Sequence, residues 1–181
     1  MFSLNKYKNS ALFLVKFFAT YFLLFAIYAT YLNKSQDKEN GFQCATITTS
    51  VANQPASVLH FFGYNVVTVQ HDAEMSVKLL VNDVYTARVI EGCNSISIII
   101  LFVAFIVAFS GPKRATFVYA IVGSVIIYVI NILRIAFLTM MLYKYPEQQT
   151  LLHNLVFPAI IYGTTFLLWV IWVQKFSYHK K

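Results

Sequence analysis

The sequence has few charged residues and few cysteines. Of its 181 residues, 12% are charged and only seven are acidic. Soluble domains carry about 25% charged residues, so this composition argues against a soluble domain. The only cysteines are Cys44 and Cys93, which limits the chain to one internal disulfide bond. The motif HDAE (71–74) could in principle bind a metal, but it has no second cluster at ligand spacing. We therefore expect a solvated turn there, and neither a metal nor a cofactor.

The sequence consists largely of long apolar runs. Hydrophobic residues make up 59% of the chain and aromatic residues 17%, with tyrosines at the ends of the runs, as in an interfacial belt. Crossing a bilayer takes roughly 20 apolar residues, and the candidate spans are residues 11–32, 93–110, 116–142 and 155–173. The sequence thus predicts an all-α polytopic membrane protein, a single membrane domain over residues 1–181 with about four transmembrane helices.

The charges are distributed unevenly between the predicted loops. With four spans, eight cations fall on one side of the membrane, namely Lys6, Lys8, Lys16, Lys113, Arg114, Lys175, Lys180 and Lys181. All the acidic residues fall on the other side, namely Asp37, Glu39, Asp72, Glu74, Asp83, Glu91 and Glu147. Basic residues concentrate on the cytoplasmic side of membrane proteins, so we expect both termini in the cytoplasm. This orientation accounts for the net charge of +7, and nucleic-acid binding is not needed to explain it.

The loop 33–92 is too long for a simple connector, and we expect a small mixed α/β extracytoplasmic insert between the first two membrane helices. Residues 47–64 have the pattern of an amphipathic helix, whose apolar face comprises Val51, Val58, Leu59 and Phe62. Residues 64–70 and 75–90 have the pattern of short strands, with a turn near Asn82.

A thiol precedes the second apolar run, in VIEGCNSISIII (89–100). With four spans this run begins outside, so Cys93 is expected at the N-terminal end of its helix, near the outer interface. The unpaired N–H groups and the dipole of a helix N-terminus stabilise a thiolate, which is the reactive form of cysteine. Asn94 and Ser95 are suited to cap this end. Glu91 opposes thiolate formation if it comes close, so a cationic neighbour is expected to matter.

Arg134 supplies a charge inside the third apolar run. A guanidinium there costs at least about 2.5 kcal/mol, so such a residue usually faces protein or a polar cavity and marks a functional site. Helical spacing places Tyr128 and Asn131 on the same face as Arg134. The alternative is a structural arginine that extends to the interface or pairs with Glu91.

His153, followed by Asn154, opens the fourth run at the same outer boundary. Imidazole can accept a proton from a thiol and return it to a leaving group, although a lone histidine at a membrane boundary is more commonly a plain interfacial residue. Together, Cys93, Arg134 and His153 supply a nucleophile, a cation for an oxyanion and a proton carrier. Cys–His acyl transfer needs these groups.

Three motifs resemble those of the exosortase/archaeosortase family of membrane transpeptidases. They are EGCNS (91–95) before an apolar helix, NILRI (131–135) within the next helix and LLHN (151–154) opening the last. The resemblance covers roughly residues 45–175, and the short form with an outer insert is most similar to the exosortase F branch.

The resemblance implies Cys93 as nucleophile, His153 as proton carrier and Arg134 as stabiliser of the tetrahedral intermediate. The residues expected to support them are Asn94, Asn131, Tyr128 and Asn154. It also implies the partners: secreted proteins whose C-terminal tail carries a recognition motif, a transmembrane helix and a basic cluster, together with membrane lipid and an unknown acyl acceptor. The enzyme would lie in the bacterial cytoplasmic (inner) membrane and cleave these tails on the extracytoplasmic side, through a thioacyl intermediate.

Two other readings remain open at this point. The first is a noncatalytic membrane protein with a Cys44–Cys93 disulfide, because both cysteines would lie in an oxidising compartment. The second is a small transport component in which Arg134 is an anion site. The sequence also leaves open whether water or another acceptor resolves a thioester.

Overall fold

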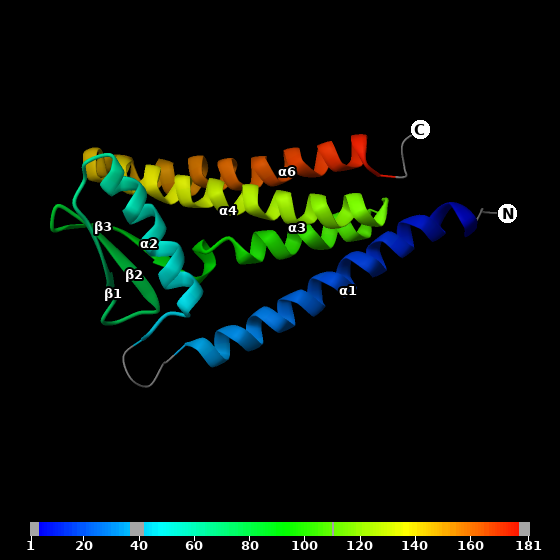
Figure 1. The fold of residues 1–181 in the computed structure, drawn as a ribbon, viewed down its shortest axis with the longest axis horizontal. Helices are drawn as coiled ribbons and strands as arrows, with labels where there is room; N and C mark the ends of the chain where they lie inside the picture. The colour runs from blue at the N-terminus through cyan, green and yellow to red at the C-terminus, as the bar shows by residue number, and fades with distance from the viewer. Residues whose placement is uncertain (1–3, 37–41, 110, 178–181) are drawn as a thin grey trace.

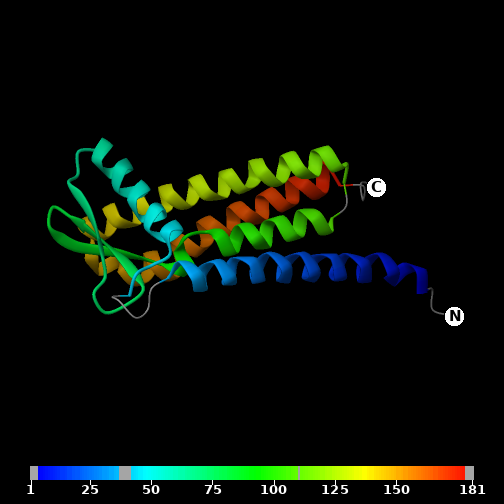
Figure 2. The same ribbon diagram turned by 60° about the horizontal axis from the view of Figure 1, so that its bottom comes forward.

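Apolar helices run side by side in a bundle, and a shorter helix and a small sheet cover one end of it (Figure 1). The computed structural model describes residues 4–36, 42–109 and 111–177. Four of the charges used above for orientation lie outside these residues, namely Asp37, Glu39, Lys180 and Lys181. We call the end that carries the sheet the sheet end. At the opposite, terminal end, α1 (Leu4–Ser35) begins and α6 (Phe157–Lys175) ends (Figures 1 and 2).

The described residues contain three helices that are long and apolar enough to cross a membrane. They comprise Ser10–Ser35 of α1, the whole of α4 (Lys113–Lys144) and the segment Pro146–Lys175, which includes α6. The apolar helix α3 (Ile96–Ala108) has 13 residues and is only about 20 Å long, whereas the hydrocarbon core of a bilayer is about 30 Å thick. The architecture is mostly helical, as expected, but the count of four full spans is not confirmed.

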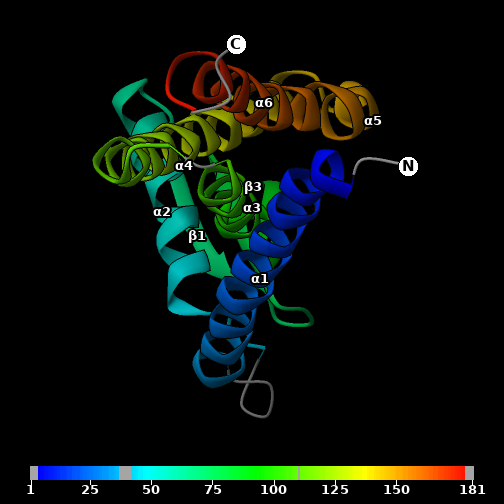
Figure 3. The same cartoon turned by 90° about the vertical axis from the view of Figure 1, so that its right-hand side faces the viewer.

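The short helix α3 forms the centre of the bundle. Viewed along the bundle, α3 lies between α1, α4 and α6 (Figure 3), and it contacts all three. Phe102 of α3, Ile127 of α4 and Trp172 of α6 are fully buried in the cluster between them. Gly123 of α4 faces the Phe102 ring so closely that a methyl group there would overlap it. The bundle is therefore packed most tightly around α3.

The predicted insert contains a helix and an antiparallel sheet. These elements are α2 (Thr46–Phe61), β1 (Val66–Gln70), β2 (Ser76–Val81) and β3 (Val84–Ile90), with the strands in the order β1-β2-β3. Asn82 and Asp83 join β2 to β3, with φ angles of 48° and 65°. Two consecutive positive φ angles define a type I′ turn, whose twist matches that of the hairpin. The predicted turn near Asn82 is thus confirmed.

The insert is fixed to the bundle by a hydrophobic cluster of its own. Val51 and Leu59 of α2, Leu79 of β2 and Ile135 of α4 are all buried in it. Phe62 follows the last residue of α2 and is 66% exposed, but it lines an apolar pocket together with Val58 and Leu59, so it lies on the predicted face.

Candidate functional site

The chain turns between the sheet and α3, and Cys93 lies in this turn. The single 3₁₀ turn η1 (Glu91–Cys93) follows β3, and α3 begins at Ile96. Cys93 therefore precedes the helix by three residues instead of lying in its first turn. Ser95 has a left-handed backbone with φ of 64°, and its hydroxyl donates to the Asn94 carbonyl oxygen at 2.6 Å, so its side chain does not cap α3 as expected. The Cys93 thiol is free and half-buried.

Asn94 connects this turn to three helices. It is 1% exposed, and its side-chain amide donates to the Tyr28 hydroxyl of α1 at 2.6 Å and to the Thr48 hydroxyl of α2 at 3.1 Å. Its side-chain oxygen accepts the backbone N–H of Ile96 at 3.1 Å, so Asn94 satisfies one N–H group at the start of α3, although the N-cap residue itself is Ser95. A buried amide with these partners fixes the backbone on which Cys93 is placed.

Glu91 is directed toward the start of α2. Its carboxylate accepts the backbone N–H of Ala45 at 2.8 Å and the hydroxyl of Thr48. The ion pairs of the described residues lie within the insert, and none joins Glu91 to Arg134. The structure therefore does not contain the pairing that would make Arg134 a partner of this carboxylate.

Two polar residues of α4 contact Cys93. The buried Asn131 donates its side-chain N–H to the Cys93 carbonyl oxygen at 2.9 Å. The half-buried Arg134 lies close enough to the Cys93 side chain for an electrostatic interaction between the two groups. Tyr128 lies near the same cluster, but its hydroxyl accepts a hydrogen bond from Gln54 of α2 at 2.7 Å. The cation and the thiol are thus neighbours, although 41 positions separate them in the sequence.

His153 lies in an unusual helical turn. After η2 (Pro146–Gln148) and α5 (Gln149–Leu151), residues Leu152–Val156 (η3) form a π-helical turn that leads into α6. Pro158 accounts for it, because proline has no N–H for the α-helical bond and its ring crowds the carbonyl four residues earlier. Single π turns of this kind are frequent at functional sites.

The imidazole of His153 is separate from the thiol in this structure. It is exposed, and its Nδ1 lies 3.3 Å from the Asn154 side-chain oxygen. The structure describes no hydrogen bond from His153 to Cys93 or Arg134. His153 instead lines a pocket of about 430 Å³. Leu138, one helical turn beyond Arg134 on α4, lines the same pocket and connects the two regions.

The three predicted residues lie at a similar depth from the terminal end. Along α4, Arg134 is 20 residues beyond Arg114, which corresponds to about 30 Å of helix. Along the last helix, His153 is 22 residues from Lys175, or about 33 Å. Cys93 is at the level of Arg134, because the two side chains interact. The distance of this layer from the basic residues at the terminal end thus equals the thickness of a hydrocarbon core, about 30 Å.

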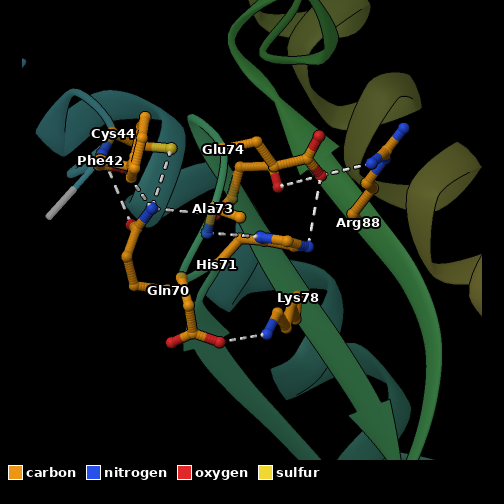
Figure 4. A network of polar contacts seen from close by, with 10 residues as sticks. Phe42, Cys44, Gln70, His71, Ala73, Glu74, Lys78 and Arg88 are labelled. Carbon is orange, nitrogen blue, oxygen red and sulfur yellow. Dashed lines mark hydrogen bonds and ion pairs between the residues drawn. The ribbon is translucent and has the colours of Figure 1, made fainter. Parts of the chain in front are cut away.

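Cys44 occupies a different environment from Cys93. It is buried in the insert core, where its sulfur lies 3.7 Å from the side-chain nitrogen of Gln70 (Figure 4). Burial raises the pKa of the Cys44 thiol above its ordinary value. Both cysteines are free, so the disulfide of the noncatalytic reading is not formed in this structure.

The motif HDAE forms the connection between β1 and β2, and its side chains pair with neighbouring strand residues (Figure 4). Asp72 accepts from Lys78 at 2.7 Å, which lowers the pKa of that carboxyl. Glu74 accepts from the Ser76 hydroxyl at 2.9 Å and from Arg88, and these contacts lower its pKa. Within the described residues, no three metal-ligating side chains form a cluster.

Sequence reasoning missed the partners that hold the Cys93 turn. Tyr28 has the appearance of an interfacial tyrosine and Thr48 that of an ordinary residue in the first turn of a helix. Both bind Asn94 across 66 and 46 positions of the chain, respectively. No local periodicity or spacing indicates such contacts, so only the tertiary structure reveals them.

Comparison with known families gives one match. The family model described as transmembrane exosortase (Exosortase_EpsH) matches residues 9–173, which is nearly the whole chain. The matched range contains the thiol turn, the guanidinium of α4 and the histidine of the π turn. Neither a curated protein nor a solved structure matches the chain.

Proposed function

The chain belongs to the transmembrane exosortase family, a family of cysteine transpeptidases, and we propose that it cleaves the C-terminal tails of secreted proteins with Cys93 as its nucleophile. The observation that carries the proposal is the interaction of the Cys93 thiol with the Arg134 guanidinium inside an apolar bundle. A membrane arginine placed beside a free thiol supplies the positive charge that an acyl-transfer intermediate needs.

The proposed reaction forms a thioester and then resolves it. The Cys93 sulfur attacks the carbonyl carbon of the scissile peptide bond, and His153 takes the thiol proton. The negative charge that develops on the carbonyl oxygen is stabilised by Arg134. When the C–N bond breaks, His153 protonates the leaving amine, and the secreted protein remains attached to Cys93. An acceptor amine or hydroxyl, or water, then attacks the thioester, and its proton restores the thiol.

His153 needs to approach the thiol for this reaction. Catalytic hydrogen bonds are often long in the free enzyme and shorten only when substrate binds. The pocket that contains His153 is lined by Leu138, which lies one helical turn from Arg134 on α4. A tail that fills this pocket would lie between the imidazole and the thiol, where proton transfer to the leaving amine is direct. Asn94, Asn131, Tyr128 and Asn154 would act as positioning residues, because their hydrogen bonds hold the backbone or the helices around the site.

The depth of the site suits a substrate with its own membrane helix. We propose that the chain is of the exosortase F type, which its short form with an insert resembles, and that it lies in the bacterial cytoplasmic membrane. Both termini would face the cytoplasm, because Lys8, Lys113, Arg114 and Lys175 all lie toward the terminal end. The site then lies about 30 Å away, at the extracytoplasmic boundary. A tail helix with a basic cytoplasmic end would place its outer end at this same level. Membrane lipid surrounds both partners.

A processing assay in cells tests this function. Secreted reporters, each fused to a predicted tail from the same genome, are co-expressed with the protein, and their cleavage is followed by size. We expect cleavage with the wild-type enzyme and with Cys44→Ala, and none with Cys93→Ala. Since both variants remove one thiol, Cys44→Ala is the matched control. Cleavage that survives Cys93→Ala at an unchanged rate would refute the proposed nucleophile.

A further inference from the structure

One edge of the sheet borders the pocket that contains His153. With the strand order β1-β2-β3, the two edges are β1 and β3. α2 packs against β1, whereas β3 extends beside the outer turns of α4. The pocket is lined by four consecutive residues of β3 and by Leu138, Leu142, Gln149 and His153 on the opposite wall. Successive residues of a strand point to opposite faces of the sheet, so a lining of consecutive residues indicates a pocket that follows the strand edge.

A second pocket continues along the same edge. It has a volume of about 540 Å³, and it again contacts consecutive β3 residues, Val84, Tyr85 and Thr86. Its other wall includes Leu142, Pro146 and Gln149. The two pockets share Tyr85, Thr86, Leu142 and Gln149, so together they form one groove between β3 and the connection from α4 to α6.

The backbone of β3 borders this groove, and within it the Val84 carbonyl accepts the Thr86 hydroxyl at 2.9 Å. Within the described residues, the backbone–backbone hydrogen bonds of residues 84–88 are those of the ladder with β2. An edge strand presents its remaining N–H and C=O groups as a template for another extended chain. Thr86 forms a bulge, because Tyr85 pairs with Leu80 and Ala87 pairs with Leu79. Bulges and exposed charges such as Arg88 hinder the pairing of two identical edges, which favours a different partner over a second copy of this chain.

The C-terminal end of the β3 edge lies close in the sequence to Cys93, the proposed nucleophile. β3 ends at Ile90, and Cys93 follows it by three residues. On the opposite wall, Leu138 is one turn beyond Arg134 and His153 faces the groove. An extended segment that lies along β3 thus passes His153 and ends beside the thiol and the guanidinium. Among the charged and titratable lining residues, Arg88 is paired with Glu74, while Tyr85 and His153 offer a hydroxyl and an imidazole to an occupant of the groove.

We propose that the residues of the substrate tail that precede its membrane helix bind as an added strand along β3. This proposal rests on the proposed function and names the substrate-binding site for it. Main-chain hydrogen bonds to the strand edge supply affinity, and the groove selects side chains, as in other cases of strand addition. The strand directs the scissile bond toward Cys93, while the membrane helix of the tail continues into the bilayer.

Photo-crosslinking tests the proposal directly. Tyr85 is replaced by p-benzoylphenylalanine, a substitution of one aromatic residue by another, in the Cys93→Ala background that retains uncleaved tail. Gln149→p-benzoylphenylalanine probes the opposite wall. Val69 on the other edge of the sheet, which has a similarly exposed side chain, is the control position. The probe is the tail reporter of the processing assay, and crosslinked residues are identified by mass spectrometry.

We expect crosslinks from positions 85 and 149 to the residues just before the tail helix, at least tenfold above the control position. Crosslinks no stronger than the control, crosslinks confined to the tail helix, or crosslinks to a second copy of this chain would each overturn the proposal. Cleavage of the reporter by the wild-type enzyme distinguishes a failure of the strand-addition proposal from a failure of the proposed function. If the reporter is cleaved in a Cys93-dependent way without the expected crosslinks, strand addition is wrong and the proposed function stands. If the crosslinks form but the reporter is never cleaved, strand addition stands and the proposed catalysis is wrong.

Discussion

Replacing Arg134 with glutamine probes the electrostatic part of the mechanism. The guanidinium lies close to the Cys93 side chain, and we take about 4 Å as its distance from an oxyanion on the carbonyl that this thiol attacks. At that distance two unit charges attract by about 4 kcal/mol when the effective dielectric constant is about 20. This corresponds to roughly a thousandfold in rate, and loss of one oxyanion donor usually costs about 100- to 1,000-fold. We therefore expect Arg134→Gln to slow formation of the thioester by about 100- to 1,000-fold.

The assay is single-turnover acylation of Cys93 by a tail reporter in membranes. Arg134→Lys is expected to lie between the wild type and Arg134→Gln, because an ammonium keeps the charge but loses the planar fork of donors. Arg114→Gln removes an exposed arginine at the opposite end of the same helix and is the matched control. Elution volume and yield in detergent show whether each variant folds. Acylation of folded Arg134→Gln at the wild-type rate would refute the role given to this residue.

Three further predictions concern stability and thiol access. Gly123→Ala should lower the unfolding free energy by about 1–3 kcal/mol, because the added methyl overlaps the Phe102 ring. Gly163→Ala is the control, since its added methyl meets no atom within 4 Å, and thermal melting should show no such loss for it. Because their pKa values are lowered in the fold, Asp72 and Glu74 stabilise the insert above the ordinary carboxyl pKa of about 4, and this contribution should disappear as the pH falls through the lowered values. The variant Asp72→Asn, Glu74→Gln should lose that pH dependence in melting experiments. A maleimide should label the half-buried Cys93 thiol well before the buried Cys44 thiol, and equal labelling would contradict this difference in burial.

Sequence patterns predicted the strands and the turn of the insert well, because alternation and turn residues are signals that lie within a few neighbouring positions. The alternation of residues 75–90 and the Asn82-Asp83 pair indicate a hairpin, and the structure contains one with a type I′ turn. The 13-residue length of α3 was missed, because an apolar run does not show that the chain still turns at Cys93–Ser95 before the helix begins.

The site was predictable only in part. Composition and spacing singled out Cys93 and Arg134, and the structure brings these two together through the antiparallel packing of α3 and α4. The buried amides of Asn94 and Asn131 acquire their significance only from partners that are distant in the sequence. The π turn at His153 follows from Pro158, which the sequence shows, but its effect on the imidazole position depends on the neighbouring helix.

The most direct test of the account is to capture the thioester on Cys93. The wild-type protein is co-expressed with a tail reporter, the membranes are quenched in acid, and peptides containing Cys93 are analysed by mass spectrometry. The account predicts an acyl group from the reporter on Cys93, attached at the residue before the cleavage point and absent in Cys93→Ala. Cys93 recovered without an acyl group and oxidised to Cys44 in native membranes would contradict it.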